Sequence, residues 1–404
     1  MRVLVYPHTM ELGGSQLNAV ELAGAVQRLG HEVMVISEPG PLVDYVTAAG
    51  LPHVELDPAR RRPARDTVRM IRALAEERGL DVIHGYEWPP GVEAYWASLG
   101  CRASAVCTVM SMSVAPFLPP SLPLVVGTRE IQLAAERGRR AVHLIEPPVD
   151  TEANAPGHPV AAFRERFGLA AGPFDLVAVT RLAPELKLEG LLTAIGVVGR
   201  LATELNLRLI VVGDGPARAE VEQHAAAACA LAGRRAVVLT GQLADPRPAY
   251  AAATACLGMG GSALRAMAFA KPLIVQGELG FFELLTPDTE KIFLEKGWYG
   301  LGAGRHEGGA RFEAALRRLH EDPGLRVKLG EHGRALVVRR FSLERAAHTQ
   351  VEIYERAVAE RPVPGDRLGV AAGVLAYKLR RRYQRLRGTD RREDFNAVAR
   401  TARR

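Results

Sequence analysis

Short apolar stretches alternate along this chain with longer segments of helical period, and this alternation restricts the fold more than any other feature. Strand candidates in the first part of the chain are residues 2–6, 31–37, 81–84, 104–109, 122–127 and 141–146. Helix candidates at 15–30, 66–79 and 128–138 lie between them. Strands that alternate with helices predict parallel sheets joined by helical crossovers. We therefore predict an α/β protein.

The segment 146–159 interrupts this periodicity with four prolines and a glycine, which is typical of a linker. Beyond it, a second series has strand candidates at 174–182, 207–215, 236–241, 254–260 and 271–277. We predict two Rossmann-like domains, residues 1–150 and 151–341, that face each other across a cleft. A helix at 342–360 would pack back across the hinge, and residues 361–404 would form a tail. Open α/β sheets bind ligands at the carboxyl ends of their strands, so the cleft is the expected site.

The net charge of +7 is concentrated in the last part of the sequence. Residues 367–404 hold 12 basic and 3 acidic side chains, which leaves residues 1–366 at −2. A nearly neutral body carries no general nucleic-acid signature, so no nucleic acid is expected as a partner. Any polyanionic surface is expected to bind the tail.

Composition excludes several other classes of protein. With 404 residues and 48% hydrophobic content, the chain can bury substantial cores, which excludes disorder and small disulfide-stapled folds. The four cysteines lack CxxC spacing, which argues against a structural zinc site and an oxidising compartment. The first apolar run stops at Pro7, too early for a signal peptide, and no window has the roughly 18 apolar residues of a spanning helix. We expect a cytoplasmic protein.

Two glycine turns are candidate anion sites. ELGGSQLNAVELA places Gly13 and Gly14 before a helix with Ser15 as its expected N-cap, and LGMGGSALRAMAFA places Gly261 before another with Ser262 as its cap. Glycines allow a ligand to approach the backbone, and a helix N-terminus offers free amides to an anion. The first turn lacks the third glycine of GxGxxG, so a nicotinamide or flavin cofactor is not expected. Tight turns without a ligand are the alternative.

Two cations accompany the second glycine turn. VTRLAPELK puts Arg181 at the end of a strand and Lys187 just before a helix. A forked guanidinium and a point-charge ammonium together suit a diphosphate. Alone, these two residues would be interpreted as solvated charges on a loop. Their occurrence together with the glycine turns is what indicates a diphosphate site.

Several stretches together resemble the retaining GT-B glycosyltransferases of family four, the group 1 glycosyltransferases, over about residues 1–358. They are GGSQLNAVELA, DVIHGYEW, EPPVDTE, VTRLAPELK, LIVVGDGP, VVLTGQL and GGSALRAMAFAKPLIV. The resemblance implies a GT-B fold and transfer of a sugar from a nucleoside-diphosphate sugar, with no bound metal or other cofactor. The acceptor would bind the N-terminal half and the donor the C-terminal half, with catalysis on closure.

Carried over by position, the resemblance also implies a donor site. Its residues would be Gly13, Gly14, Arg181, Lys187, Gly213, Gly215, Gly261, Ser262, Ala263, Leu264 and Arg265. The two cations and the amides at 262–264 would hold the diphosphate, while Gly213 and Gly215 would shape the turn of VVGDGP. A cationic clamp is chemically sensible, because negative charge grows on the diphosphate as the glycosidic bond breaks.

The chain departs from the family pattern at positions that matter. The two glutamates usually found eight residues apart correspond here to Leu257 and Arg265, and a guanidinium cannot accept a hydrogen bond. The usual His-x-His is replaced by a single histidine, a glycine and a tyrosine. The catalytic candidates are therefore His84, Tyr86 and Glu278, a carboxylate just after KPLIVQG that can substitute for the missing ones.

Three functions are open at this point. The first is a glycosyltransferase with an acceptor from a polysaccharide, lipid-linked or natural-product pathway, for which His8 and Glu87 are candidate acceptor contacts. The missing glutamates favour a second, a catalytically degenerate GT-B binding subunit or scaffold at the membrane. The third is a nucleotide-sugar epimerase or hydrolase.

The tail segment 367–388 begins apolar and ends basic. Leu368, Leu375, Leu379 and Tyr383 fall roughly on one face of a helix, which suits a helix that lies in the interface of an anionic membrane. A solvated basic tail is the alternative. We expect peripheral association with the inner membrane face.

Overall fold

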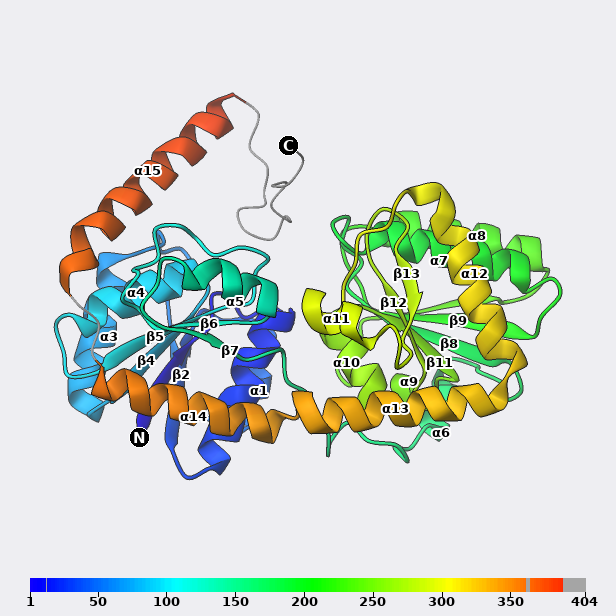
Figure 1. Ribbon diagram of the computed structural model, residues 1–404, viewed down its shortest axis with the longest axis horizontal. Helices are drawn as coiled ribbons and strands as arrows, with labels where there is room; N and C mark the ends of the chain where they lie inside the picture. The colour runs from blue at the N-terminus through cyan, green and yellow to red at the C-terminus, as the bar shows by residue number, and fades with distance from the viewer. Residues whose placement is uncertain (12, 361–363, 388–404) are drawn as a thin grey trace. The chain divides into compact units, whose positions relative to one another are not determined.

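The computed structural model of the protein describes residues 1–11, 13–360 and 364–387. Its contacts divide the chain into two compact units (Figure 1). Unit 1 comprises Met1–Pro148 and the described residues from Leu343 onward, and unit 2 comprises Val149–Ser342. Unit 1 is therefore built from two separate stretches of chain, with unit 2 inserted between them in the sequence.

Unit 1 contains a seven-stranded parallel sheet in the order β3-β2-β1-β4-β5-β6-β7. Its strands are β1 (Arg2–Tyr6), β2 (Glu32–Ser37), β3 (His53–Glu55), β4 (Val82–Tyr86), β5 (Ser104–Val109), β6 (Leu124–Val126) and β7 (Val142–Leu144). β4 and β5 are buried along their whole length, as expected for central parallel strands. The strand order reverses between β1 and β4, so the carboxyl ends of these strands form the switch point at which such sheets bind ligands.

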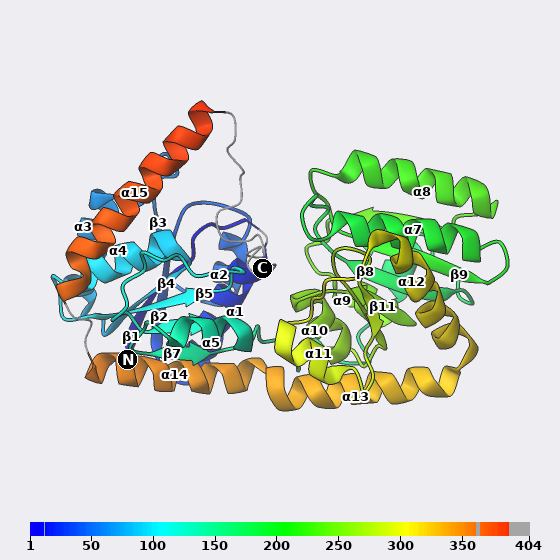
Figure 2. The ribbon, with the colours of Figure 1, turned by 45° about the horizontal axis from the view of Figure 1, so that its top comes forward.

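Helices cover both faces of this sheet. They are α1 (Gly14–Arg28), α2 (Val43–Ala48), α3 (Arg65–Arg78), α4 (Trp88–Ser98), α5 (Arg129–Glu136), α14 (Leu343–Ala359) and α15 (Arg367–Leu386). One core lies between the sheet and helices α1 and α14, and the other lies under α3, α4 and the first half of α15 (Figure 2). Helix α14 therefore completes a core that begins at the N-terminus of the sequence.

Unit 2 contains a six-stranded sheet in the order β10-β9-β8-β11-β12-β13. Its strands are β8 (Phe174–Val179), β9 (Leu207–Val212), β10 (Val237–Gly241), β11 (Ala255–Gly258), β12 (Leu273–Gln276) and β13 (Phe282–Leu284). All neighbours pair in parallel except β12 and β13, which are antiparallel. The order again reverses in the middle of the sheet, between β8 and β11.

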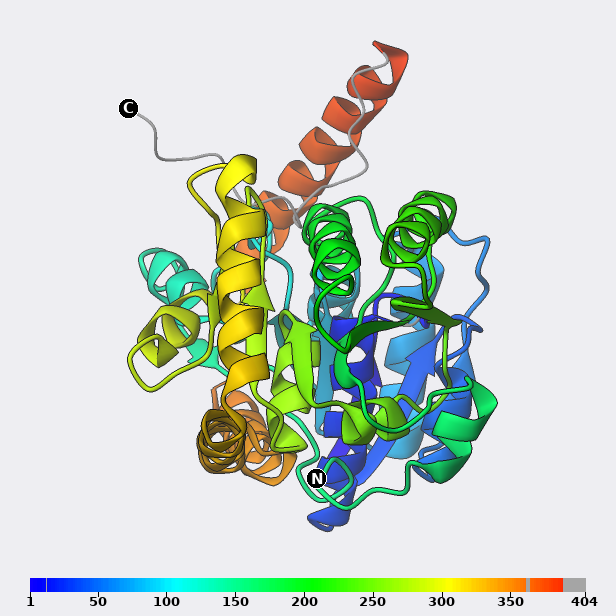
Figure 3. The same cartoon turned by 90° about the vertical axis from the view of Figure 1, so that its right-hand side faces the viewer.

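The helices of unit 2 form a layer on each face of its sheet. They are α6 (Ala161–Arg166), α7 (Leu188–Leu201), α8 (Arg218–Ala232), α9 (Arg247–Ala252), α10 (Gly261–Ala268), α11 (Glu290–Lys296), α12 (Arg305–Glu321) and α13 (Pro323–Phe341). Helices α7, α8 and α12 share one core with the sheet, and α9, α10 and α13 share the other. Figure 3 shows this unit in front, with the green helices α7 and α8 above its strands. Each unit is thus a three-layer α/β sandwich of Rossmann type.

The strands expected from the sequence are all present, with ends that differ by at most a few residues. The short strands β3 and β13, of three residues each, were not expected. Helix α4 was also missed, since it begins with WPP, and prolines in a first turn start a helix as well as they break one. No helix in the described part of the chain is both long and apolar enough to span a membrane.

Candidate functional site

The turn after β9 in unit 2 packs against the segment that carries Arg181. Gly213 and Gly215 have φ angles of +144° and +158°, which favour glycine. A Cβ atom at Gly213 would lie 1.9 Å from the carbonyl oxygen of Thr180, and one at Gly215 would lie 2.5 Å from that of Leu182. Both positions therefore require glycine, and they fix the backbone on either side of Arg181.

Arg181 and Lys187 lie at the carboxyl edge of the unit 2 sheet. Arg181 follows β8 and is exposed, whereas Lys187 is the N-cap residue of α7 and is half-buried. Burial, and then the positive charge of Arg181, lower the pKa of Lys187. Within the described residues, neither side chain has a hydrogen-bond partner or a carboxylate in ion-pair contact. A bound anion would offset this concentration of positive charge.

Helix α10 begins at the glycine turn after β11, and its cap differs from the one expected. The N-cap residue is Gly260, with φ +54°, and the hydroxyl group of Ser262 bonds to the preceding turn instead of capping the helix. The amides of Ala263 and Leu264 donate to the carbonyl oxygen of Gly260 at 3.1 and 3.3 Å. Among the described residues, the amides at the helix start without a partner are therefore those of Gly261 and Ser262.

Leu257 and Arg265 occupy the two positions at which the family usually has glutamates. Leu257 lies in β11, is 2% exposed and belongs to the hydrophobic core. Arg265 is half-buried in α10, and a Cβ atom at Gly261 would lie 3.4 Å from its Nη1 atom. The turn after β11 therefore offers a cation and two free amides, and Leu257 offers it no polar group.

Glu278 is the carboxylate that follows the neighbouring strand, β12. Its half-buried side chain accepts a hydrogen bond from the hydroxyl group of Tyr299. Burial and this hydrogen bond raise the pKa of Tyr299, so the phenol stays protonated as the donor. The main chain of Glu278 also donates to the Gly300 carbonyl at 3.1 Å and accepts from the Gly302 amide at 2.9 Å. Glu278 is therefore held in place through both its side chain and its backbone.

Glu189 joins the loop after β12 to the start of α7. Its Oε1 atom accepts a hydrogen bond from the amide of Gly280 at 2.8 Å. Lys187 lies two residues before Glu189, and Glu278 lies two residues before Gly280, so this bond connects the two segments that carry them. Sequence reasoning missed Glu189 and Tyr299, because neither belongs to a recognisable motif and both act on residues distant in the sequence.

The first glycine turn belongs to unit 1 and also differs in its cap. The N-cap residue of α1 is Gly13, in an extended conformation, and not Ser15. The side chain of Gln16 covers Gly13, since a Cβ atom there would lie 2.5 Å from its Oε1, and it donates to Thr9 Oγ1 at 2.9 Å. A Cβ atom at Gly14 would meet no described atom within 4 Å. Packing therefore explains the glycine at position 13, and the space beside Gly14 is open.

The structure does not support a catalytic role for His84 and Tyr86. His84 is fully buried in β4, with Nδ1 2.7 Å from the Tyr354 hydroxyl oxygen and Nε2 2.7 Å from Thr108 Oγ1. Burial lowers the pKa of His84 to about 3 and raises the pKa of Tyr86, which is 2% exposed. Both side chains point into the core completed by α14, so they pack the interior and do not face a ligand.

The next residue, Glu87, does reach the carboxyl edge of the sheet. It has φ +68° and is 8% exposed. Its carboxylate accepts hydrogen bonds from the Met110 amide (2.9 Å), the Ser111 amide and hydroxyl (3.1 and 2.6 Å) and the Ser15 hydroxyl (3.4 Å). Burial raises its pKa, and these bonds oppose the rise. Glu87 thus ties together the loops after β4 and β5 and the start of α1.

His8, at the end of β1, is neutral near pH 7. Burial and then the charge of Arg62 lower its pKa to about 4, and its Nδ1 atom has no partner among the described residues. Arg60 and Arg62 both pair with Glu38 next to it, and Arg62 also donates to the carbonyl oxygen of His8. The sequence did not indicate this buried ionic cluster. His8 can contact an acceptor only as a neutral hydrogen-bonding group.

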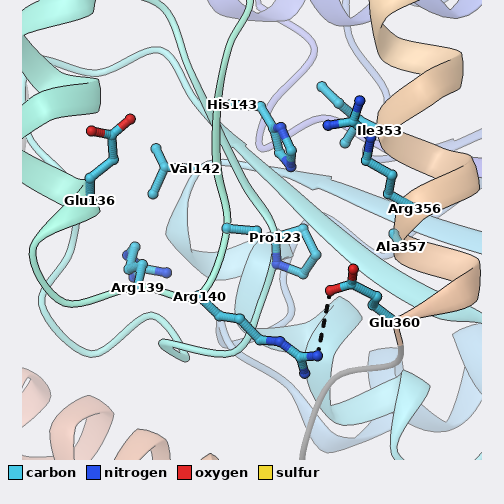
Figure 4. Close-up of a pocket in the computed structure, with 11 residues that line it drawn as sticks. Pro123, Glu136, Arg139, Arg140, Val142, His143, Ile353, Arg356, Ala357 and Glu360 are labelled. Carbon is cyan, nitrogen blue, oxygen red and sulfur yellow. Dashed lines mark ion pairs between the residues drawn. The ribbon is translucent and has the colours of Figure 1, made fainter.

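A separate pocket of about 540 Å³ lies near the amino end of β7 (Figure 4). Arg140 pairs there with Glu360 at 3.4 Å, and Arg139 donates to the carbonyl oxygens of Leu118 and Pro119. The pocket is lined by Pro123, Glu136, Arg139, Arg140, Ala141, Val142, His143, Ile353, Arg356, Ala357 and Glu360. None of the residues predicted from the sequence is among them, and the amino end of a parallel sheet is not its ligand edge. The candidate site therefore lies elsewhere.

Solved structures share the architecture of this chain. A glycosyltransferase of Rickettsia africae matches with a TM-score of 0.71 at 16% identity, covering 88% of this chain and 98% of the other. An Anabaena protein crystallised with UDP matches with a TM-score of 0.69 at 15% identity, covering 88% and 100%. Two Rossmann-type units with this likeness define a GT-B fold, as the sequence predicted.

Family models then identify the chain. A model described as group 1 glycosyl transferases matches residues 173–301, and a model of a glycosyl transferase 4-like domain matches residues 13–147. The protein belongs to the group 1 glycosyltransferases, which confirms the family inferred from its motifs.

Two curated relatives are enzymes of this kind. The D-inositol 3-phosphate glycosyltransferase of Kineococcus radiotolerans is 27% identical and aligns with 89% of this chain and 94% of its own length. The 2-deoxystreptamine glucosyltransferase of Streptomyces kanamyceticus is 30% identical, over 56% of this chain and 58% of its own length. The protein is thus a glycosyltransferase.

Proposed function

We propose that the protein transfers a sugar from a nucleoside-diphosphate sugar to an acceptor, with retention of configuration and without a metal ion. The observation that carries this proposal is the pair Arg181 and Lys187, two cations without a carboxylate partner in the described chain. The free amides of Gly261 and Ser262 belong to the same carboxyl edge of unit 2. Cations and helix-start amides together suit a diphosphate.

The same groups can stabilise the transition state. As the bond between sugar and diphosphate breaks, negative charge grows on the leaving oxygen, and fixed cations nearby lower the barrier. Burial already makes the charged form of Lys187 unfavourable in the free protein, so an arriving diphosphate gains a strong partner. This supports leaving-group stabilisation by the protein itself. No group of three His, Cys, Asp or Glu side chains within the described residues is arranged to hold a metal.

We assign Glu278 to the hydroxyl groups of the donor sugar. A carboxylate accepts hydrogen bonds, which neither Leu257 nor Arg265 can do at the turn after β11. Tyr299 bonds Oε2 of Glu278, which leaves Oε1 for a ligand. Retention is carried over from the family, and the anomeric configuration of the product, read by NMR, tests it.

We propose that the acceptor binds unit 1 at the carboxyl ends of β1 and β4, near Gly14, Glu87 and His8. The open space beside Gly14 and the carboxylate of Glu87 support this location. The acceptor would come from a polysaccharide, lipid-linked or natural-product pathway. Two relatives, named for D-inositol 3-phosphate and 2-deoxystreptamine, are consistent with a hydroxylated small acceptor or head group.

The second candidate is a GT-B protein that binds nucleotide sugars without transferring them, or that hydrolyses or epimerises them. The burial of Leu257 in the core favours it, because the usual carboxylate is missing there. A panel of UDP-, GDP- and ADP-sugars, scored by release of the nucleoside diphosphate, separates transfer from hydrolysis, and NMR of the recovered nucleotide sugar detects epimerisation. Release that requires an acceptor supports transfer, and release in water alone supports hydrolysis. If the protein bound no nucleotide at all, transfer, hydrolysis, epimerisation and binding without reaction would all be refuted.

We also propose that the enzyme works in the cytoplasm at the inner face of the membrane. The support is the excess of basic side chains on α15. Fractionation of cells that express the full chain tests this location.

A further inference from the structure

Helix α15 is attached to unit 1 through one of its faces. Val370 and Val374 are buried in the core under α3 and α4, and the ring of Tyr377 packs against Trp88 and Phe117 with centroid distances of 5.3 Å to each. Just before the helix, the carboxylate of Asp366 accepts a hydrogen bond from the amide of Ser121 at 2.8 Å. The first half of α15 is therefore part of the folded unit.

The opposite face of α15 is also apolar, and it is exposed. Its side chains are spaced by seven, four, four and three residues, which puts them on one side of an α-helix. They are Leu368 (83% exposed), Leu375 (60%), Leu379 (58%), Tyr383 (53%) and Leu386 (80%), which we call the outer stripe. Figure 2 shows the second half of the helix extending away from the sheet of unit 1. An exposed apolar row of this length marks an interaction surface.

Basic side chains lie on both sides of the outer stripe. On an ideal helix Lys378, Arg382 and Arg385 fall along one border, and Arg380 and Arg387 fall along the other, and all five are exposed. No acidic residue occurs in α15, and the guanidinium of Arg387 lies over the ring of Tyr383 at 4.6 Å. The surface is thus an apolar row between two cationic rows.

We propose that the outer stripe binds the surface of an anionic lipid bilayer, with α15 parallel to the membrane plane. The leucines and Tyr383 enter the boundary between head groups and acyl chains, and the flanking cations meet the head-group phosphates. A nucleic acid would satisfy the cations but leave the leucines in water. A second copy of the chain would bring like charges face to face. The charge pattern therefore favours an anionic membrane over both.

The attachment of α15 also bears on the acceptor, an extension that rests on the proposed function. Trp88, which holds Tyr377, is the first residue of α4 and directly follows Glu87. The contact between α15 and α4 therefore lies beside the loops to which we assign the acceptor. This favours an acceptor carried by a lipid in the same bilayer.

The test uses the full chain and two kinds of vesicle, pure phosphatidylcholine and equal parts of phosphatidylcholine and phosphatidylglycerol. We expect co-sedimentation with the anionic vesicles only. The stripe variant Leu375→Ser/Leu379→Ser/Tyr383→Ser should bind about a hundredfold more weakly. The charge variant Lys378→Gln/Arg380→Gln/Arg382→Gln should lose a similar factor at low salt.

Each of these two variants has its own control. Leu133→Ser/Leu231→Ser/Val327→Ser removes three exposed apolar side chains elsewhere and should leave vesicle binding unchanged. Arg380→Lys/Arg382→Lys keeps the charge and should also bind. Equal vesicle binding by the wild type and the stripe variant would overturn the proposal. It would also be overturned if the wild type failed to bind vesicles and instead bound nucleic acid or associated with itself through α15.

Nucleotide binding by unit 2, measured with UDP, GDP and ADP on the same samples, separates this inference from the proposed function. Vesicle binding without any nucleotide binding would leave α15 as a membrane helix and refute the enzyme proposal and the lipid-linked acceptor. Nucleotide binding without vesicle binding would refute the membrane helix alone.

Discussion

The carboxylate of Glu189 accepts a hydrogen bond from the main-chain amide of Gly280 at 2.8 Å. Because Glu189 lies in the first turn of α7 and Gly280 lies in the loop after β12, this one bond links the segment of Lys187 to the segment of Glu278. The proposed partners of the diphosphate and of the sugar are thus held by a shared support. The effects of substituting Lys187 and of substituting Glu278 can be measured separately only in variants that keep this hydrogen bond.

Replacing Lys187 with methionine should stabilise the protein and weaken nucleotide binding. Burial lowers the pKa of Lys187, so its charged form is unfavourable in the folded state and methionine removes that cost. We expect the free energy of unfolding to rise by about 1 kcal/mol. Affinity for the nucleoside diphosphate should fall at least about tenfold, since a charged hydrogen bond contributes about 1.5–3 kcal/mol. Thermal unfolding with and without UDP, GDP or ADP measures both effects.

The control for this change is Lys291→Met on α11, where the lysine side chain is 87% exposed. It should change neither stability nor affinity appreciably. Undiminished nucleotide affinity in Lys187→Met would contradict the proposed diphosphate site.

Replacing Glu278 with glutamine should separate sugar chemistry from nucleotide binding. The amide keeps the shape of the side chain but loses the charge that accepts hydrogen bonds from sugar hydroxyls. We expect turnover to fall about a hundredfold with nearly unchanged affinity for the nucleoside diphosphate. Tyr299→Phe should give a smaller loss, because it frees the carboxylate without removing it. Release of nucleoside diphosphate from the best donor measures both variants.

Glu283→Gln serves as the matched control, since Glu283 lies in the short strand β13 of the same unit. If it lowers turnover as much as Glu278→Gln does, Glu278 has no special role. If Glu278→Gln mainly weakens nucleotide binding, the carboxylate does not act on the sugar.

Replacing Gly213 with alanine should disrupt the support of Arg181. The new Cβ atom would stand 1.9 Å from the Thr180 carbonyl oxygen, at a φ of +144° that alanine adopts only under strain. We expect a loss of about 2 kcal/mol or more in the free energy of unfolding, together with weaker nucleotide binding. Urea unfolding followed by tryptophan fluorescence measures the first effect.

Gly196→Ala provides the contrast within the same unit. Gly196 is exposed in α7, and a Cβ atom there meets no described atom within 4 Å. This variant should gain about 0.5–1 kcal/mol, because alanine loses less freedom in a helix than glycine does. A stable Gly213→Ala protein with normal affinity would argue against the role assigned to the turn.

Acid should destabilise unit 1 because of its buried histidines. The pKa of His84 is about 3 in the folded protein, against 6.5 for an ordinary histidine, so the unfolded chain binds more protons between these values. Stability is therefore present above about pH 6.5 and is lost as the pH falls. From about pH 7.5 to about pH 5, His84 alone should account for a loss of about 2 kcal/mol. His8, with a folded pKa of about 4, adds to it.

The variant His84→Gln should show a flatter dependence of stability on pH, since an amide does not titrate. Chemical unfolding at several pH values measures this, with the exposed His224→Gln as the control. Nucleotide binding by unit 2 should survive His84→Gln, as expected for a packing residue. A variant with the same pH dependence as wild type would show that the burial of His84 is not the cause.

The sequence predicted the fold well because the information needed is local. Alternating apolar runs and helical periods mark β8, β9 and β12 directly, and the prolines of 146–159 mark the boundary between the series. Strand order and helix faces could not be read in this way. His84 and Tyr86 therefore looked available at a strand end, although their side chains point into a core that a distant helix, α14, completes.

The candidate site was predicted in part. Arg181, Lys187, Gly213 and Gly215 come from motifs, and the structure brings the turn of the two glycines against the segment of Arg181. Hydrogen-bond partners distant in sequence were not predictable. Ser15 bonds to Glu87 instead of capping its helix, because the fold brings the loop after β4 to it.

The insertion of unit 2 within unit 1 sets an order on folding during synthesis. Val149 and Phe341, near the two ends of unit 2, are joined by a main-chain hydrogen bond of 2.8 Å, so unit 2 can close as soon as its last helix has left the ribosome. Unit 1 must wait longer, because its core includes Tyr354 and Ala357 of α14. Residues 1–148 are made before unit 2 but stay exposed on one face of their sheet until α14 has also been made. This half of the enzyme is thus the one that chaperones would have to protect.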